Sequence, residues 1–166
     1  MNDDMIQDRH IHNPTHAGRQ TRSLQLFRSA SFLCGIFENE IARVAHWREP
    51  IPLPQAPQTV LGVVSIQGRM LTVLNLAVLL DSSVALSNRS PQNIVALRGD
   101  EQLALGVDAV SETIEIGDGL LDEVLDSGQG LVLGVINHDG AEVMILNVKG
   151  LFPSAIQGRE RRRRRF

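Results

Sequence analysis

Short apolar stretches separated by polar turns run through most of this 166-residue chain. The clearest lies at residues 60–80, VLGVVSIQGRMLTVLNLAVLL, where Gln67 and Gly68 interrupt the apolar positions. Val, Ile and Thr are frequent here, and these β-branched residues fit a pleated strand better than a helix. The pattern predicts a β-hairpin whose turn is formed by Gln67 and Gly68.

The same pattern of two apolar arms around a short polar turn predicts three further hairpins, at residues 24–36, 93–110 and 131–146. Residues 40–47 predict one more strand, and the prolines that follow it predict an extended connector. The acidic residues 111–128 predict a solvated linker with a single strand at its start. Roughly nine or ten short strands indicate an all-β protein, and closing into barrels is how such strands avoid exposed edges.

A Leu-Gly-Val step recurs three times, with its glycine at Gly62, Gly106 and Gly134. Each time it adjoins β-branched residues, so we expect it to open a strand. Glycine suits a bulge, a sharp bend or the close approach of another backbone. We therefore predict a structural role for these three glycines.

Amino-acid composition limits the size of the core and the classes of function. At 43% hydrophobic the chain can bury one substantial core or two small ones packed together. Aromatic residues make up only 4%, which argues against a nucleic-acid surface built on base stacking. Cys34 is the single cysteine, and the sequence shows neither an apolar leader nor a spanning segment. We expect a cytoplasmic protein.

The chain divides into three parts. Residues 1–23 lack hydrophobic periodicity and predict a disordered leader. Residues 24–152 predict the folded domain, with approximate subdomains at 24–80 and 92–152 between which strands can cross. Residues 153–166 predict a disordered basic tail.

No arrangement of reactive side chains indicates an enzyme. The sequence contains no Gly-x-Ser-x-Gly, Walker lysine loop, dinucleotide fingerprint or His-Glu-x-x-His. His10, His12 and His16 lie in the predicted leader without a scaffold, and the acidic residues 111–128 lack the ordered oxygen ligands of an EF-hand. We expect no catalytic residue, no cofactor and no bound metal.

Several short motifs follow one another in a recognisable order. They are Gly-Ile at 35–36, Ile41 with Val44, Pro-Gln-Ala-Pro at 54–57, Leu-Gly-Val at 61–63 leading to Gly68, and Leu-Gly-Val-Asp-Ala-Val at 105–110. In this order and spacing, residues 24–152 resemble the CheW-like family, the chemotaxis coupling adaptors.

The resemblance implies two intertwined five-stranded barrels of SH3-like character and no enzymatic activity. It implies a scaffold that bridges a CheA-type histidine kinase to the cytoplasmic tips of chemoreceptors in membrane-associated arrays. We expect the receptor tip to enter a groove at the junction of the barrels and the kinase to contact residues 105–110. The candidate partner-binding residues are Ile41, Arg43, Val44, Val63, Ser65, Gln67, Gly68, Leu105, Val107, Asp108 and Val110.

Four positions depart from the family's motifs. Gln67 replaces an arginine, Arg43 an acidic residue, and Thr72 and Asn75 the Pro and Asp of Pro-x-x-Asp-Leu. Losing an acid and an arginine together costs less than leaving one charge unpaired. We therefore expect weak binding to a standard receptor tip and stronger binding to a cognate receptor, as in a pilus-type or other accessory chemosensory pathway.

Charge leaves one alternative open. The tail carries +5 from residue 159 onwards and residues 1–23 carry 0, so the net charge of −3 leaves −8 on residues 24–158. An acidic body binds nucleic acid poorly, but a small β-barrel module could bind nucleic acid or an anionic membrane surface through this tail. The tail residues concerned are Arg161, Arg162, Arg163, Arg164 and Arg165.

Overall fold

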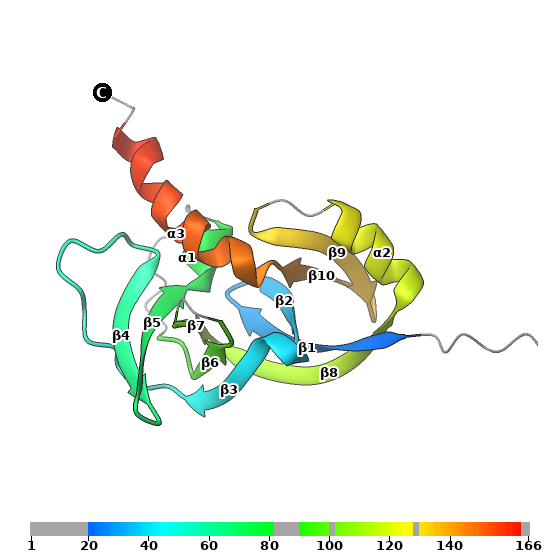
Figure 1. Ribbon diagram of the computed structural model, residues 1–166, viewed down its shortest axis with the longest axis horizontal. Coiled ribbons are helices and arrows are strands. Elements are labelled where there is room, and N and C mark those ends of the chain that lie inside the picture. The colour runs from blue at the N-terminus through cyan, green and yellow to red at the C-terminus, as the bar shows by residue number, and fades with distance from the viewer. Residues whose placement is uncertain (1–19, 82–89, 100–101, 128–129, 164–166) are drawn as a thin grey trace, which may run out of the picture.

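The computed structural model describes residues 20–81, 90–99, 102–127 and 130–163. Within these residues it contains ten strands, three α-helices and one 3-10 turn, which confirms the all-β prediction. Figure 1 shows the strands grouped around two centres, with α3 crossing between them. The elements are β1 (Thr21–Ser29), β2 (Phe32–Phe37), η1 (Glu38–Glu40), β3 (Ile41–His46), β4 (Val60–Ile66), β5 (Arg69–Asn75), α1 (Leu76–Leu80), β6 (Asn93–Leu97), β7 (Leu103–Val107), β8 (Ala109–Gly117), α2 (Asp118–Ser127), β9 (Val132–His138), β10 (Ala141–Leu146) and α3 (Val148–Arg163).

The strands form two five-stranded sheets. The first sheet has the order β8-β1-β2-β10-β9, and the second sheet has the order β3-β6-β7-β5-β4. The first sheet therefore takes strands from both ends of the chain, whereas the second is built from the continuous stretch β3 to β7. The two units are intertwined, as expected. The approximate division into 24–80 and 92–152 does not follow the sheets, because β6 and β7 pair with β3 and β5.

Each sheet curls around its own apolar cluster without closing. Among the described residues β8 does not pair with β9, and β3 does not pair with β4. The side chains of all strands of a sheet nevertheless pack into one apolar cluster. In the second sheet this cluster contains Val64, Val73, Ile94 and Ala104, with Ala45 of β3 packed against them. The prediction of closed barrels is therefore corrected to two curled, open sheets.

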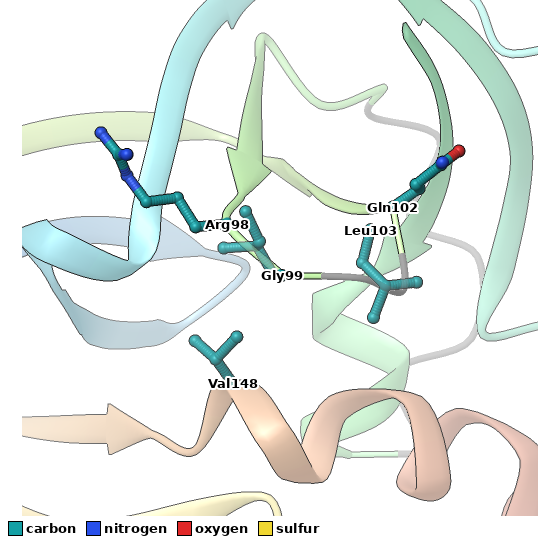
Figure 2. Close-up of a pocket in the computed structure, with 6 residues that line it drawn as sticks. Arg98, Gly99, Gln102, Leu103 and Val148 are labelled. Carbon is teal, nitrogen blue, oxygen red and sulfur yellow. The ribbon is translucent and has the colours of Figure 1, made fainter.

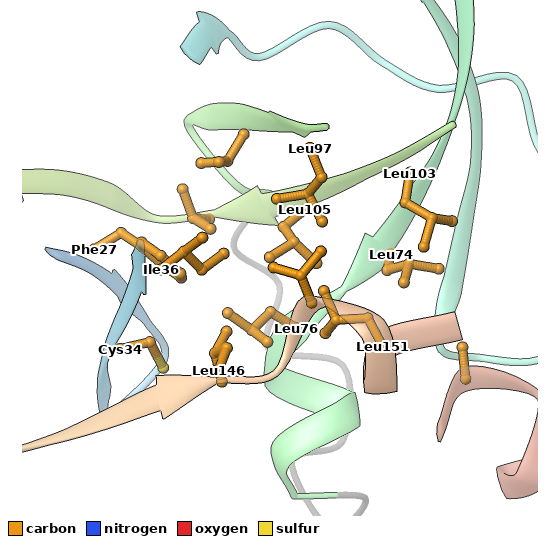
Figure 3. Close-up of a cluster of buried hydrophobic side chains, with 14 residues drawn as sticks. Phe27, Cys34, Ile36, Leu74, Leu76, Leu97, Leu103, Leu105, Leu146 and Leu151 are labelled. Atoms are coloured by element: carbon orange, nitrogen blue, oxygen red, sulfur yellow. The ribbon is translucent and has the colours of Figure 1, made fainter. Parts of the chain in front are cut away.

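A larger cluster fills the space between the sheets (Figure 3). Phe27, Cys34 and Ile36 enter it from the first sheet, and Leu74 and Leu105 enter it from the second. Burial raises the pKa of the Cys34 thiol to about 12, so this cysteine is an inert core residue. Apolar side chains thus occupy the junction where the sequence had led us to expect a groove.

The hairpin turns have the backbone that their sequences predict. Gln67 and Gly68 have φ of 50° and 77°, and Asp139 and Gly140 have φ of 50° and 79°. Two consecutive positive φ angles define a type I′ turn, whose twist matches that of the flanking strands.

Two helices occupy stretches that the sequence had indicated to be irregular. The acidic linker prediction is wrong for α2, which buries Leu121 and Val124 in the core of the first sheet. The tail prediction is wrong as far as Arg163, because α3 packs Val148 and Leu151 into the central cluster and continues past Pro153. None of the helices in the described ranges is long and apolar enough to cross a membrane.

The folded part also begins earlier than predicted. β1 starts at Thr21, and its first residues pair with the end of β8, Thr21 opposite Gly117. Residues 1–19 and 164–166, which complete the predicted leader and tail, lie outside the described residues.

Candidate partner-binding surface

Two hollows on the described part of the chain offer little to a small molecule. One of about 10 Å³ has room for about one water and is lined by Leu97, Arg98, Gly99, Gln102, Leu103 and Val148 (Figure 2). The other is an open depression of about 400 Å³ lined by Arg22, Ser23, Glu38 and Asn39. Arg22 there already donates to Asn39 Oδ1 at 3.2 Å and lies 3.7 Å from the Phe37 ring centre. Function is therefore to be sought on a surface.

An apolar surface lies on the outer side of the β4–β5 hairpin. Val63 pairs with Ile51 of the connector, and Ser65 pairs with Met70 of β5. Directly opposed residues of antiparallel strands share a face, so these four side chains lie together, and we call them the outer face. Ile51 is 70% exposed and Met70 is 52% exposed. Ile51 and Met70 flank β4 on this one face, and exposed large apolar side chains on a shared face are typical of a contact surface.

Strand β3, the first predicted wall, lies at the other end of the second sheet from β4. Arg43 is exposed and Val44 is 40% exposed, whereas Ile41 is partly buried against the central cluster. Arg48, just after β3, donates from Nη1 to the Ser65 carbonyl at 3.3 Å. This contact links the segment after β3 to β4, while β3 and β4 themselves are the two end strands of the second sheet and do not pair.

The turn residues Gln67 and Gly68 are exposed at the tip of the β4–β5 hairpin. Arg43 lies on β3, the opposite end strand of the second sheet. Within the described residues no hydrogen bond or ion pair joins Arg43 to Gln67. The two departures from the family's motifs therefore occupy separate points of the surface.

The predicted kinase-facing segment is largely internal. Leu105 and Val107 have 0% exposure, so the prediction that they contact a partner is wrong. Asp108 is partly buried, and its Oδ2 accepts a hydrogen bond from the Ala30 N–H at 2.8 Å. It thereby holds the β1–β2 turn, where Ala30 has a φ of 51°. Val110 is partly buried against the central cluster.

Asn75 also has a structural role. Its Oδ1 accepts from the Val78 N–H at 3.3 Å, which caps the N-terminus of α1. Asn and Asp are about equally favourable as the N-cap residue of a helix. The replacement of the family's Asp by Asn75 therefore preserves the cap.

The three predicted structural glycines all have close neighbours. A Cβ on Gly62 would run into the Ile51 carbonyl, and one on Gly106 would lie 3.0 Å from Pro91 Cγ. A Cβ on Gly134 would lie 3.2 Å from Val124 Cγ1. Gly106 stands near the end of β7 rather than at its start, so the expected role in opening a strand does not apply there.

Sequence reasoning missed Ile51 and Met70 as surface residues. Ile51 lies in the proline-rich connector, whose pairing with β4 has no local signal. Met70 could have been found, because the buried positions Leu71 and Val73 place it on the opposite face of a strand with period two.

Comparisons with known proteins agree with this architecture. A model of the CheW-like domain matches residues 23–155. The chain is 26% identical over 118 residues to a chemotaxis protein CheW of Rhizobium meliloti (strain 1021), covering 69% of this chain and 76% of that protein. Its fold matches that of the scaffolding protein TtCheW from Thermoanaerobacter tengcongensis with a TM-score of 0.63 at 19% identity, covering 80% and 93% of the two chains. Because the domain match covers most of its length, the chain belongs to the CheW-like family.

Proposed function

We propose that this chain couples the cytoplasmic tips of chemoreceptors to a CheA-type histidine kinase, in the cytoplasm at receptor arrays. Its family consists of non-enzymatic scaffold proteins with an adaptor role in chemotaxis. The finer statement, which partners it joins, rests on the resemblance together with the surface described above.

The outer face is the observation that supports the proposal most strongly. It presents Ile51, Val63 and Met70 on the same face as Ser65, and Val44 is exposed on β3 of the same sheet. A helical receptor tip could lay an apolar stripe on such a surface, as amphipathic helices do on apolar grooves. We assign the receptor tip to the outer face and to β3.

The test is a calorimetric titration of the chain with a cognate receptor-tip fragment. Met70→Glu places a charge in the centre of the outer face and is expected to weaken binding at least about tenfold. Val135→Glu is the matched control, because Val135 is 53% exposed but lies on β9 of the first sheet. Equal losses for both variants would remove the outer face from the proposal.

Arg43 and Gln67 are proposed to set receptor choice. The same titration is run with a standard and a cognate receptor tip, using wild type and the double change Arg43→Glu with Gln67→Arg. We expect the double change to favour the standard tip. Equal affinity in all four combinations would mean that these positions do not set specificity.

The kinase is proposed as a partner on family grounds, and its surface is left unassigned because Leu105 and Val107 are buried. Titrating a kinase fragment against Met70→Glu and Val135→Glu indicates whether it uses the outer face, the first sheet or neither. Failure of the wild-type chain to bind any CheA-type kinase would contradict the coupling function.

A further inference from the structure

We propose a binding site for a divalent transition-metal ion at the open seam of the first sheet, formed by Glu112, His138 and Asp139. His138 Nε2 lies 3.4 Å from Glu112 Oε1 and 3.4 Å from Asp139 Oδ2. All three possible ligand atoms lie within 4.8 Å of one another. In the described part of the chain, this is the group of three possible metal-binding side chains whose ligand atoms lie this close together.

The fold places these residues from two different edges. Glu112 lies on β8 and His138 on β9, and these are the two end strands of the first sheet, which do not pair with each other. The curl of the sheet brings the two edges together at this point. An ion bound here would link β8 to the β9–β10 hairpin, at the place where no ladder of backbone hydrogen bonds joins these two end strands of the sheet.

Both sides of the seam are held by hydrogen bonds. On the hairpin side, Asn137 Oδ1 accepts from the Gly140 N–H at 3.2 Å, which fixes the turn that carries Asp139. On the β8 side, Gln25 Nε2 donates to the Ser111 carbonyl at 2.8 Å, and Thr113 Oγ1 donates to Gln25 Oε1 at 3.0 Å. These bonds hold the backbone on either side of Glu112 and in the turn that carries Asp139.

The donor set and its spacing fit zinc-like ions. Imidazole nitrogen with carboxylate oxygens is a donor set that Zn²⁺ accepts, at bond lengths of about 2.0–2.2 Å. Two ligands of a tetrahedral ion with such bonds lie about 3.3–3.5 Å apart, which matches the two separations of 3.4 Å. Three protein ligands leave a position for water, and the exposed carboxylates indicate a site open to solvent.

The charge of the group also favours a cation. The carboxylates of Glu112 and Asp139 both lie 3.4 Å from the same imidazole nitrogen, so two negative groups meet at this point. A divalent ion would balance both negative charges and take the nitrogen lone pair. This proposal departs from the expectation of no bound metal drawn from the sequence. Sequence spacing gives no sign of this arrangement, because Glu112 and His138 are 26 residues apart and meet only through the sheet.

The experiment is thermal unfolding of the full chain with Zn²⁺, with Mg²⁺ and with a chelator. Every protein in the series has His10, His12 and His16 replaced by Gln, so that these histidines do not bind the added zinc. An ion that binds the folded seam raises Tm, and we expect a rise of several degrees with Zn²⁺ and none with Mg²⁺.

His138→Gln and Glu112→Gln should each abolish this rise and lower the zinc affinity at least tenfold. Asp139→Asn should reduce it while preserving the turn, because Asn also tolerates a positive φ. His46→Gln is the control, since His46 is an exposed histidine on β3 of the second sheet, and it should keep the full rise. The proposal is overturned if Zn²⁺ leaves Tm unchanged, or if His138→Gln retains the rise.

Discussion

At Gly62 the backbone of the connector excludes a side chain. Gly62 has a φ of 143°, and the neighbouring Val63 exchanges hydrogen bonds with Ile51 at 2.8 and 2.9 Å. A side chain at Gly62 would therefore push the connector away from β4 and displace Ile51 from the outer face. We predict that Gly62→Val lowers the free energy of unfolding by more than about 1 kcal/mol in denaturant titration.

Gly119→Ala provides the control for that substitution. Gly119 lies in α2, and a Cβ there would have no neighbour within 4 Å. Alanine in a helix should leave stability unchanged or raise it by about 0.5–1 kcal/mol. An unchanged unfolding curve for Gly62→Val would contradict the role assigned to Gly62.

Glu40 gives stability a dependence on pH. Burial raises the pKa of its carboxyl, while Arg22 and Lys149 partly oppose the shift, and Oε2 is buried without a hydrogen-bond partner. The folded state therefore binds this proton more readily than the unfolded state does, so stability falls as pH rises through the folded-state pKa. We predict that Glu40→Gln melts at a higher temperature than wild type at pH 8, and that the difference disappears below about pH 4.

Glu38→Gln is the matched change, because Glu38 lies on the same 3-10 turn but is exposed. It should follow the wild-type melting temperature across the same pH range. A Glu40→Gln variant less stable than wild type at pH 8 would show that the attraction to Arg22 and Lys149 outweighs the cost of burial.

Single residues were predictable where a strand has one buried face. In β4 the structure buries Val64 and Ile66 and exposes Ser65, which is the alternation of a strand with one buried face. The family resemblance led us to expect Leu105 and Val107 at a partner surface, but β7 lies in the middle of the second sheet and all five of its residues are buried. A strand covered on both faces has no alternation from which to separate core from surface.

Among the elements, the hairpins were predictable and two helices were not. Turn chemistry identified the β4–β5 and β9–β10 hairpins. In α2 the acidic residues suggested a solvated linker, although Leu121 and Val124 have the spacing of a buried helix face. In α3, Gly150 and Pro153 are signals against a helix, and packing of Leu151 in the central cluster overrides them.

The C-terminal half of α3 gives a prediction at the level of the element. Truncation after Gly158 keeps Val148, Leu151 and Ala155, and keeps the bond from Thr59 Oγ1 to the Ala155 carbonyl at 3.0 Å. We predict an unchanged Tm and an unchanged affinity for the receptor tip. Any binding of the full chain to anionic vesicles or oligonucleotides should be salt-dependent and lost on truncation.

Loss of receptor binding in the truncated chain would contradict the assignment of the receptor to the outer face. Strong, sequence-selective oligonucleotide binding by the full chain would support the alternative function through Arg161–Arg165 instead.

For the molecule as a whole, the intertwining of the two units, in which β3 to β7 lie in the chain between the strands of the first sheet, was expected from the family resemblance and not from local pattern. The pairing of β1 with β8 joins Thr21 to Gly117, and no short-range signal identifies such partners. The fold thereby builds each sheet around its own cluster and buries the faces between the sheets in a third. With the interior filled, partners must bind on the surface, for which the outer face is our candidate.

The central proposal, that the chain couples a receptor to a kinase, is tested most directly by co-sedimentation. Vesicles carrying the cognate receptor are mixed with its CheA-type kinase, with and without this chain, and the kinase in the pellet is measured. We expect the chain to raise the sedimented kinase several-fold and Met70→Glu to do so weakly, while Val135→Glu should match wild type unless the kinase binds the first sheet. The account would be contradicted if the amount of kinase in the pellet did not depend on the chain, or if it were equal with wild type and both variants.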